Sequence, residues 1–145
     1  MGHRSLTVAI DAPPERLYAL LVDADRLPEW MLGLKRVTIS GPLDRPGSEA
    51  TLKFGGPFTV TSRVVDTTPG ARHEVRAREM GGLVSCTTTT HLEPDGAGTR
   101  LRVDFDYFVA GGPIGRLIEG MVGNEMVGRA GREYARLKSL AEATE

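Results

Sequence analysis

The feature that most constrains the fold is an alternation of apolar and polar residues with a period of two, which recurs along most of the chain. It is clearest in TRLRVDFDYFV, residues 99–109, where Leu101, Val103, Phe105 and Tyr107 share one face and charged residues occupy the other. Successive side chains of a β-strand point to opposite faces, so such a run predicts a strand with one buried face. The chain is expected to build a sheet that packs on one side.

Other runs of this kind are separated by sequences that form turns or helices. The stretch APPERLYALLVDADRLPEW, residues 12–30, carries prolines near its start and leucines at helical spacing, which predicts a short helix or two. GPLDRPG, GGP and TPG are typical of hairpin loops. The remaining predicted strands centre on Leu6 to Ile10, Val37 and Ile39, Leu52 and Phe54, Phe58 to Val64, residues 73–78 and residues 84–94.

The segment from residue 111 to residue 143 lacks strand alternation and ends in ARLKSLAEA, a strong helix former. The expected order is a strand, short helices, six strands joined by hairpins, and one long terminal helix. This order predicts an α+β fold in which an antiparallel sheet is covered on its inner face by the helix. At 145 residues, with 40% hydrophobic content, the chain is expected to form one domain over residues 1–145.

Four consecutive threonines lie within one predicted strand, in SCTTTTHL, residues 85–92. Counting back by twos from an inward Leu92 places Thr90, Thr88 and Cys86 on the inner face. Two interpretations remain open. The inner hydroxyls either fill space while bonded to nearby backbone, or they line a polar part of a binding site.

The terminal helix carries glycines at positions 120, 123, 128 and 131, and each interior glycine costs roughly 1 kcal/mol relative to alanine. At about 100° per residue, these glycines share a face with Leu117, Asn124, Val127 and Tyr134, which is expected to turn toward the sheet. Charged residues, including Arg129 and Glu133, are expected on the opposite side. The glycines either allow close packing or leave a void, and composition does not decide between these interpretations.

A second stripe on the same helix consists of Ile118, Val122 and Met126, at i, i+4 and i+8 on the side away from the glycines. An exposed apolar stripe predicts either a contact in a homodimer or coverage by a loop.

An inner face that mixes apolar side chains with a few hydroxyls and an amide is typical of a site for a small molecule. His73 and Tyr107 are the only plausible proton donor and acceptor in this lining, and they are candidates for catalysis, although a structural role for such a histidine is commoner. The predicted ligand-binding residues are Trp30, Phe58, Val60, Ser62, His73, Val75, Thr88, Thr90, Val103, Phe105, Tyr107, Leu117, Met121, Asn124, Val127 and Gly128.

Composition and motifs argue against several other functions. A net charge of −1, from 18 basic and 19 acidic residues, gives no electrostatic footprint for nucleic acid or an anionic membrane. No stretch is long and apolar enough to span a bilayer, and none resembles a signal peptide, so integral membrane association is not expected and a cytoplasmic location is. The single Cys86 favours a small buried thiol. No metal or cofactor site is predicted, since neither a metal-ligand cluster nor a phosphate-binding motif occurs.

Three stretches, APPERLYALLVDADRLPEW, EPDGAGTRLRVDFDYFV and ARLKSLAE, in this order over essentially the whole chain, resemble the START/polyketide cyclase superfamily, also called SRPBCC. The resemblance implies a helix-grip fold, in which a seven-stranded antiparallel sheet wraps around the C-terminal helix and encloses a hydrophobic ligand cavity. It implies binding of a lipid, an isoprenoid or a polyketide-like molecule. Members of this superfamily also include polyketide cyclases and dehydratases, and regulatory or assembly proteins similar to the carbon monoxide dehydrogenase G subunit.

Overall fold

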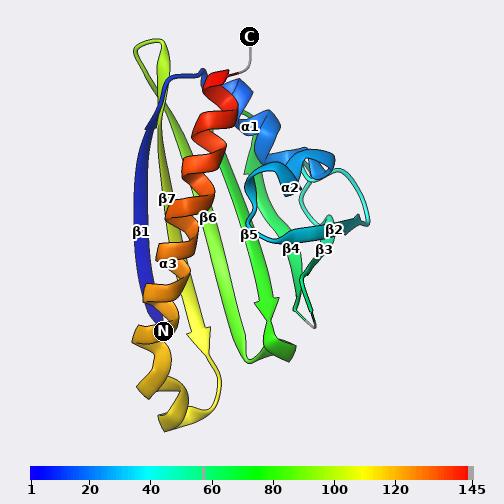
Figure 1. The fold of residues 1–145 in the computed structure, drawn as a ribbon, viewed down its shortest axis with the longest axis vertical. Helices are drawn as coiled ribbons and strands as arrows, with labels where there is room; N and C mark the ends of the chain where they lie inside the picture. Colours follow the sequence, from blue (N-terminus) through cyan, green and yellow to red (C-terminus); the bar gives the residue numbers. More distant parts are fainter. Residues whose placement is uncertain (57, 144–145) are drawn as a thin grey trace.

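The computed structural model describes residues 1–56 and 58–143, which form a seven-stranded antiparallel sheet with helices on one of its faces (Figure 1). The strands lie in the order β1-β7-β6-β5-β4-β3-β2, and each is hydrogen-bonded to its neighbours. Apart from the β1–β7 pair, neighbours in the sheet are also neighbours in sequence, as the predicted hairpins require. The strands are β1 (Gly2–Ile10), β2 (Leu34–Ile39), β3 (Glu49–Phe54), β4 (Thr59–Thr68), β5 (Arg72–Glu79), β6 (Val84–Asp95) and β7 (Gly98–Val109).

The helices follow the first and last strands. Helix α1 (Pro14–Val22), the 3₁₀ turn η1 (Ala24–Arg26) and helix α2 (Leu27–Trp30) connect β1 to β2, and a short turn η2 (Met80–Gly82) connects β5 to β6. Helix α3 (Gly112–Ala143) closes the chain. The α+β class, the seven-stranded antiparallel sheet, the short helices after the first strand and the long C-terminal helix are therefore confirmed, and together they form a helix-grip fold.

The strand register confirms which side chains of the sheet face inward. Thr90 pairs with Val103 on one side and with His73 on the other, and Cys86 pairs with Tyr107. All five side chains are buried. The inner face of the sheet thus carries the alternate residues that period-two counting selects.

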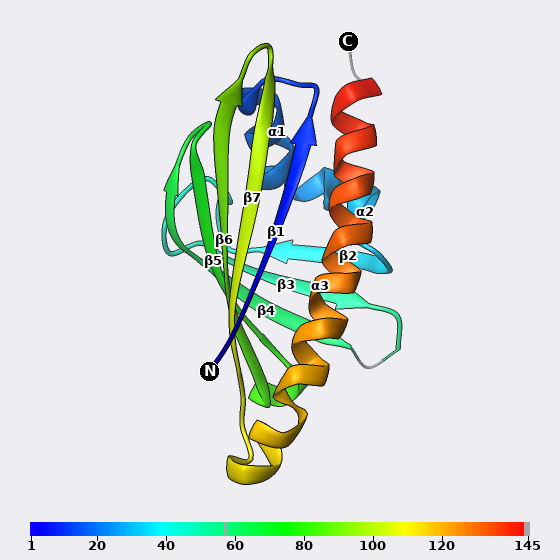
Figure 2. The ribbon, with the colours of Figure 1, turned by 90° about the vertical axis from the view of Figure 1, so that its left-hand side faces the viewer.

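Helix α3 lies along one side of the sheet, packing against β1 and β7 and against α2 (Figure 2). Its buried residues concentrate in the C-terminal half, where Ala130, Tyr134, Leu137 and Ala141 repeat at intervals of four, three and four. This spacing keeps one helical stripe on the core. Because α3 runs alongside β1 and β7, it leaves the inner side chains of the middle strands less covered.

The glycines of α3 have different environments, so neither interpretation holds for all of them. A Cβ atom at Gly123 would lie 1.9 Å from the Tyr107 hydroxyl oxygen, so this glycine allows close packing of the helix on β7. A Cβ atom at Gly120, Gly128 or Gly131 would meet no atom within 4 Å. Gly120 and Gly128 are exposed, so the prediction that they face the sheet is wrong.

The predicted orientation of the N-terminal half of α3 is also wrong. Leu117 is 83% exposed and Met121 is 72% exposed, although both were expected in the ligand site. Val122 and Met126, expected on the outer surface, are half-buried and pack against the core. The contact between Gly123 and Tyr107 sets the rotation of this half, and glycine contributes nothing to an apolar pattern from which that rotation could be read.

Candidate functional site

The predicted site residues on the sheet lie on one face, but they divide into two groups by burial. Thr90, Val103, Phe105 and Tyr107 are at most 5% exposed beneath α3. Further along the sheet, five inward-facing side chains are only half-buried, and we call them the open inner face: Val60, Ser62, Val75, Ala77 and Thr88. The helix-facing surface of the sheet is therefore closed near β7 and accessible near β4 and β5.

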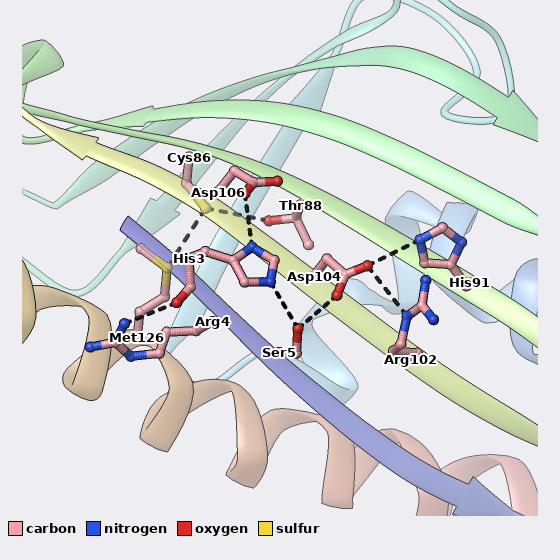
Figure 3. A network of polar contacts seen from close by, with 10 residues as sticks. All are labelled: His3, Arg4, Ser5, Cys86, Thr88, His91, Arg102, Asp104, Asp106 and Met126. Carbon is pink, nitrogen blue, oxygen red and sulfur yellow. Dashed lines mark hydrogen bonds and ion pairs between the residues drawn. The ribbon is translucent and has the colours of Figure 1, made fainter. Parts of the chain in front are cut away.

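The hydroxyls of both inner threonines contact other side chains. Thr90 forms a hydrogen bond with the hydroxyl of Tyr134, a residue whose burial raises the pKa of its phenol. The Thr88 hydroxyl oxygen lies 3.7 Å from the Cys86 sulfur, which lies 3.6 Å from the Met126 sulfur (Figure 3). Burial raises the pKa of the Cys86 thiol to about 11, so the thiol stays protonated and unreactive near neutral pH, as expected of a buried cysteine.

His73, at the start of β5, belongs to a network of polar side chains. Its Nδ1 atom lies 3.1 Å from the Thr67 hydroxyl oxygen, which lies 2.6 Å from the Tyr18 hydroxyl oxygen. Burial lowers the pKa of His73, and the charge of Asp44 opposes this only partly. The buried site thus favours the neutral form of the imidazole.

Tyr107 lies far from His73. Its ring is enclosed by Gly2 and Gly123, with the Arg4 guanidinium carbon 5.8 Å from the ring centre. In the strand register, Tyr107 is two strands away from His73 and displaced by four residues, a separation on the order of 15 Å. The structure therefore does not bring together the two candidates for proton transfer, and no joint catalytic role follows from their positions.

Several predicted site residues lie outside this face or at its margin. Asn124 is exposed, and its amide oxygen accepts a hydrogen bond from Arg4 at 3.3 Å, so the expected buried amide is absent from the lining. Gly128 is exposed on α3, as Leu117 and Met121 are. Phe58 is 58% exposed beside the β3–β4 turn. Val127 is half-buried against the core, as expected.

Trp30 is 5% exposed at the end of α2, with its ring centre 5.5 Å from that of Tyr134. Its indole Nε1–H is buried and has no hydrogen-bond partner within residues 1–56 and 58–143. A buried donor without a partner is costly, and such groups often bond to water or to a ligand. Trp30 thus contributes to the predicted set a buried donor that has no partner among the described residues.

Charged residues on the inner side of the molecule were missed by the sequence analysis. Glu133 was expected on the outer surface of α3 but is buried, where its carboxylate accepts the Leu32 N–H at 3.0 Å and lies 3.4 Å from the Arg129 Nε. Arg129 also donates to the Leu32 carbonyl and lies over the Phe54 ring at 5.0 Å. These contacts fix α3 to the loop before β2. Arg129 and Glu133 are four residues apart, so their pairing was visible in the sequence, but not that they point inward.

Glu79 is a further charged residue on the inner face that was not expected there. Its pairing with Val84, two residues from Cys86, places it on the inner face at the end of β5, where it is half-buried. Burial raises the pKa of its carboxyl, and the charge of Arg129 opposes the shift. The period-two run Val75, Ala77, Glu79 contained the signal for this orientation.

A second polar network covers the outer face of β1, β7 and β6 (Figure 3). The Ser5 hydroxyl donates to Asp104 at 2.8 Å and lies 3.1 Å from His3 Nε2, while His3 Nδ1 lies 2.8 Å from Asp106. Burial opposes ionisation of Asp104. The hydrogen bond from Ser5 and the charges of Arg102, His91 and His3 outweigh this effect, so the pKa of Asp104 is lowered. These contacts link neighbouring strands on the face that carries no helix.

Two surface hollows lie beside the C-terminal half of α3. One, of about 310 Å³, is lined by residues of β1, the β6–β7 turn and Lys138, and the other, of about 510 Å³, lies between Glu29 and the C-terminal turns of α3. Neither is lined by a residue of the predicted ligand-binding set. Within the described ranges, no three His, Cys, Asp or Glu side chains are placed to hold a metal ion, and no helix is long and apolar enough to cross a membrane.

Comparison with known proteins places this geometry in context. The family model described as "Polyketide cyclase / dehydrase and lipid transport" matches residues 1–145. The search of curated proteins gives no match.

Solved structures show the same fold at low sequence identity. A protein from Rhodobacter sphaeroides is 22% identical, with a TM-score of 0.80 over 99% of this chain and 93% of its own. Protein CV1439 from Chromobacterium violaceum is 20% identical, with a TM-score of 0.77 over 98% of both chains. DynU16, from the dynemicin biosynthetic locus, is 20% identical, with a TM-score of 0.69 over 97% of this chain and 47% of its own.

Proposed function

The chain belongs to the polyketide cyclase / dehydrase and lipid transport family, and from this premise we propose that it binds a small hydrophobic or amphipathic molecule against the open inner face of its sheet. The observation that carries the proposal is the incomplete burial of Val60, Val75, Ala77 and Thr88 on the side of the sheet that α3 faces. Apolar side chains on an inner face are normally covered, and a site that is mostly apolar with a few hydroxyls suits a lipid, an isoprenoid or a polyketide-like molecule.

The residues that line this face support a division of roles. Val60, Val75 and Ala77 offer apolar area, whose burial contributes roughly 25 cal/mol per Å². Thr88 and Ser62 offer hydroxyls that orient a ligand, and the buried indole N–H of Trp30 is a donor that an oxygen of the ligand or a water molecule could satisfy. Affinity in such a site comes mainly from apolar contact, and the polar groups select the orientation.

The test is to fill the open inner face. Native mass spectrometry of the purified protein identifies any co-purified compound, and an apolar fluorescent probe measures binding directly. We expect Ala77→Phe to weaken binding at least tenfold, because the new ring occupies the accessible face. Thr87→Phe is the matched control, since Thr87 points to the outer face next to Cys86, the cross-strand partner of Ala77. Both variants must keep the wild-type circular dichroism spectrum. Equal binding by wild type and the folded Ala77→Phe variant would reject this location.

Cyclase or dehydratase chemistry is a second candidate function, favoured by the position of Glu79. A half-buried carboxyl on a face open to ligand, with its pKa raised by burial, is suited to act as a general acid. The similarity in fold to DynU16, from a biosynthetic locus, is compatible with this chemistry.

Replacing Glu79 separates the carrier from the enzyme. If the protein is an enzyme, Glu79→Gln should reduce conversion of poly-keto substrates at least a hundredfold while binding stays within tenfold. Activity that needs the protonated carboxyl should fall as the pH rises through the raised pKa. Glu125→Gln, an exposed change on α3, is the matched control. Conversion that is unchanged in Glu79→Gln would exclude this role, and a wild-type protein that binds poly-keto compounds without converting them would favour the carrier.

A further inference from the structure

Large apolar side chains are exposed at one end of the molecule. Leu117 is 83% exposed, Met121 72% and Ile114 71%, and they recur at i, i+3 and i+7 on the first turns of α3. We call this end the apolar tip and define it by six exposed residues: Met1, Leu83, Phe108, Ile114, Leu117 and Met121. Single exposed apolar residues are ordinary, but a cluster of this kind marks an interaction surface.

The segments of the apolar tip are adjacent in the fold. The Ala110 N–H donates to the Leu83 carbonyl at 2.8 Å, which joins the turn before β6 to the start of α3. The amino group of Met1 lies 3.2 Å from the Glu119 carboxylate, which places the first residue against the same helix. Figures 1 and 2 show the first turns of α3 at the extreme end of the long axis, opposite the C-terminal end of the helix. The tip is therefore a protrusion and not a flat face.

Charged residues are sparse around the apolar tip, and two exposed arginines flank it. Residues 80–92 and 107–115 contain no Asp, Glu, Lys or Arg. The exposed charges that flank these segments at the tip are the guanidinium groups of Arg78 and Arg116 and the carboxylate of Asp106, which is paired with His3. Of the other nearby acids, Glu119 is paired with the amino group of Met1, Glu79 faces the inner side of the sheet, and Glu125 is exposed one turn beyond Met121. The surface that the tip presents is apolar with cationic flanks.

We propose that the apolar tip docks on the surface of an anionic lipid bilayer. Ile114, Leu117 and Met121 enter the boundary between head groups and acyl chains, and Arg78 and Arg116 face the lipid phosphates. A net charge of −1 gives no overall attraction, so the electrostatic part is local to the tip. Pairing of two copies through this surface is less favourable, because a two-fold contact would bring the same cationic flanks together. The docking goes beyond ligand binding and does not require it.

The test is flotation of the full chain with vesicles of phosphatidylcholine alone or of phosphatidylcholine mixed with anionic phosphatidylglycerol. We expect the wild-type protein to float with the anionic vesicles and much less with the neutral ones. Leu117→Asp and Met121→Asp should each reduce flotation at least tenfold. Arg116→Glu changes the charge by two, and at about fivefold per charge it should reduce flotation roughly 25-fold. All three positions are exposed, so the fold should be kept, which circular dichroism checks.

Matched controls lie far from the tip. Ile39→Asp replaces an exposed apolar residue on β2, and Arg100→Glu reverses an exposed charge on β7, and both should float like the wild type. The proposal is overturned if wild-type protein does not bind anionic vesicles or if folded tip variants bind as well as wild type. It is also overturned if sedimentation shows a wild-type dimer that Leu117→Asp dissociates, because the tip would then be an interface between copies. Loss of vesicle binding with retained probe binding separates this proposal from the proposed function.

Discussion

At the scale of single residues, Gly123 and Gly128 show how differently one residue type is used within one helix. A Cβ atom at Gly123 would lie 1.9 Å from the hydroxyl oxygen and 2.5 Å from the Cζ of Tyr107, a residue that is 1% exposed and cannot move aside. A Cβ atom at Gly128 would meet nothing within 4 Å. One glycine is required by packing, and the other lowers helix stability without a packing benefit.

Alanine substitutions should therefore have opposite signs. Gly123→Ala should lower the free energy of unfolding by about 1 to 3 kcal/mol, the range for an overpacked core. Gly128→Ala should raise it by up to about 1 kcal/mol, because alanine is the better helix former. Urea denaturation followed by circular dichroism measures both. If Gly123→Ala also stabilised the protein, the close contact between α3 and Tyr107 would be refuted.

At the scale of elements, the sequence predicts strands better than it predicts the orientation of the long helix. In a strand, position along the chain alone decides the face, so counting from Leu92 correctly places Thr88 and Thr90 inward. In α3, the C-terminal half has a clear buried stripe through Tyr134 and Leu137, but the N-terminal half has none. Apolar residues there lie on several sides of the helix, and tertiary contacts at Gly123 choose among them.

The same reasoning explains which parts of the candidate site could be predicted. Period two identified the apolar lining of the sheet, including Val60 and Val75, and it also carried the orientation of Glu79. The period-two pattern could not show that α3 packs alongside β1 and β7, because the path of a helix across a sheet depends on contacts between distant residues. Which inner residues are covered and which remain accessible therefore had to come from the structure.

At the scale of the whole molecule, the fold has a closed side and an open side. Leu101 and Val103 on β7 and Leu137 on α3 are fully buried, whereas Val60 and Ser62 on β4 and Val75 and Ala77 on β5 are only half-buried. Edge strand β2 and its neighbour β3 are interrupted by a bulge between Leu34 and Arg36. Regions with fewer buried contacts open at a lower free-energy cost.

Amide hydrogen exchange should therefore be slowest in β7 and the C-terminal half of α3, and fastest among the strands in β2 and β3. A ligand on the open inner face stabilises only conformations that keep this face intact. At a free ligand concentration of 100 times Kd, amide exchange that requires β4 and β5 to open should therefore slow about 100-fold. Exchange in the first turns of α3, where Ile114 and Leu117 are exposed, should change little. Mass spectrometry of peptides covering residues 59–79 and 112–122, with and without the bound compound, measures both effects. Protection that appeared only in the first turns of α3 would place the ligand at the apolar tip and contradict binding on the sheet.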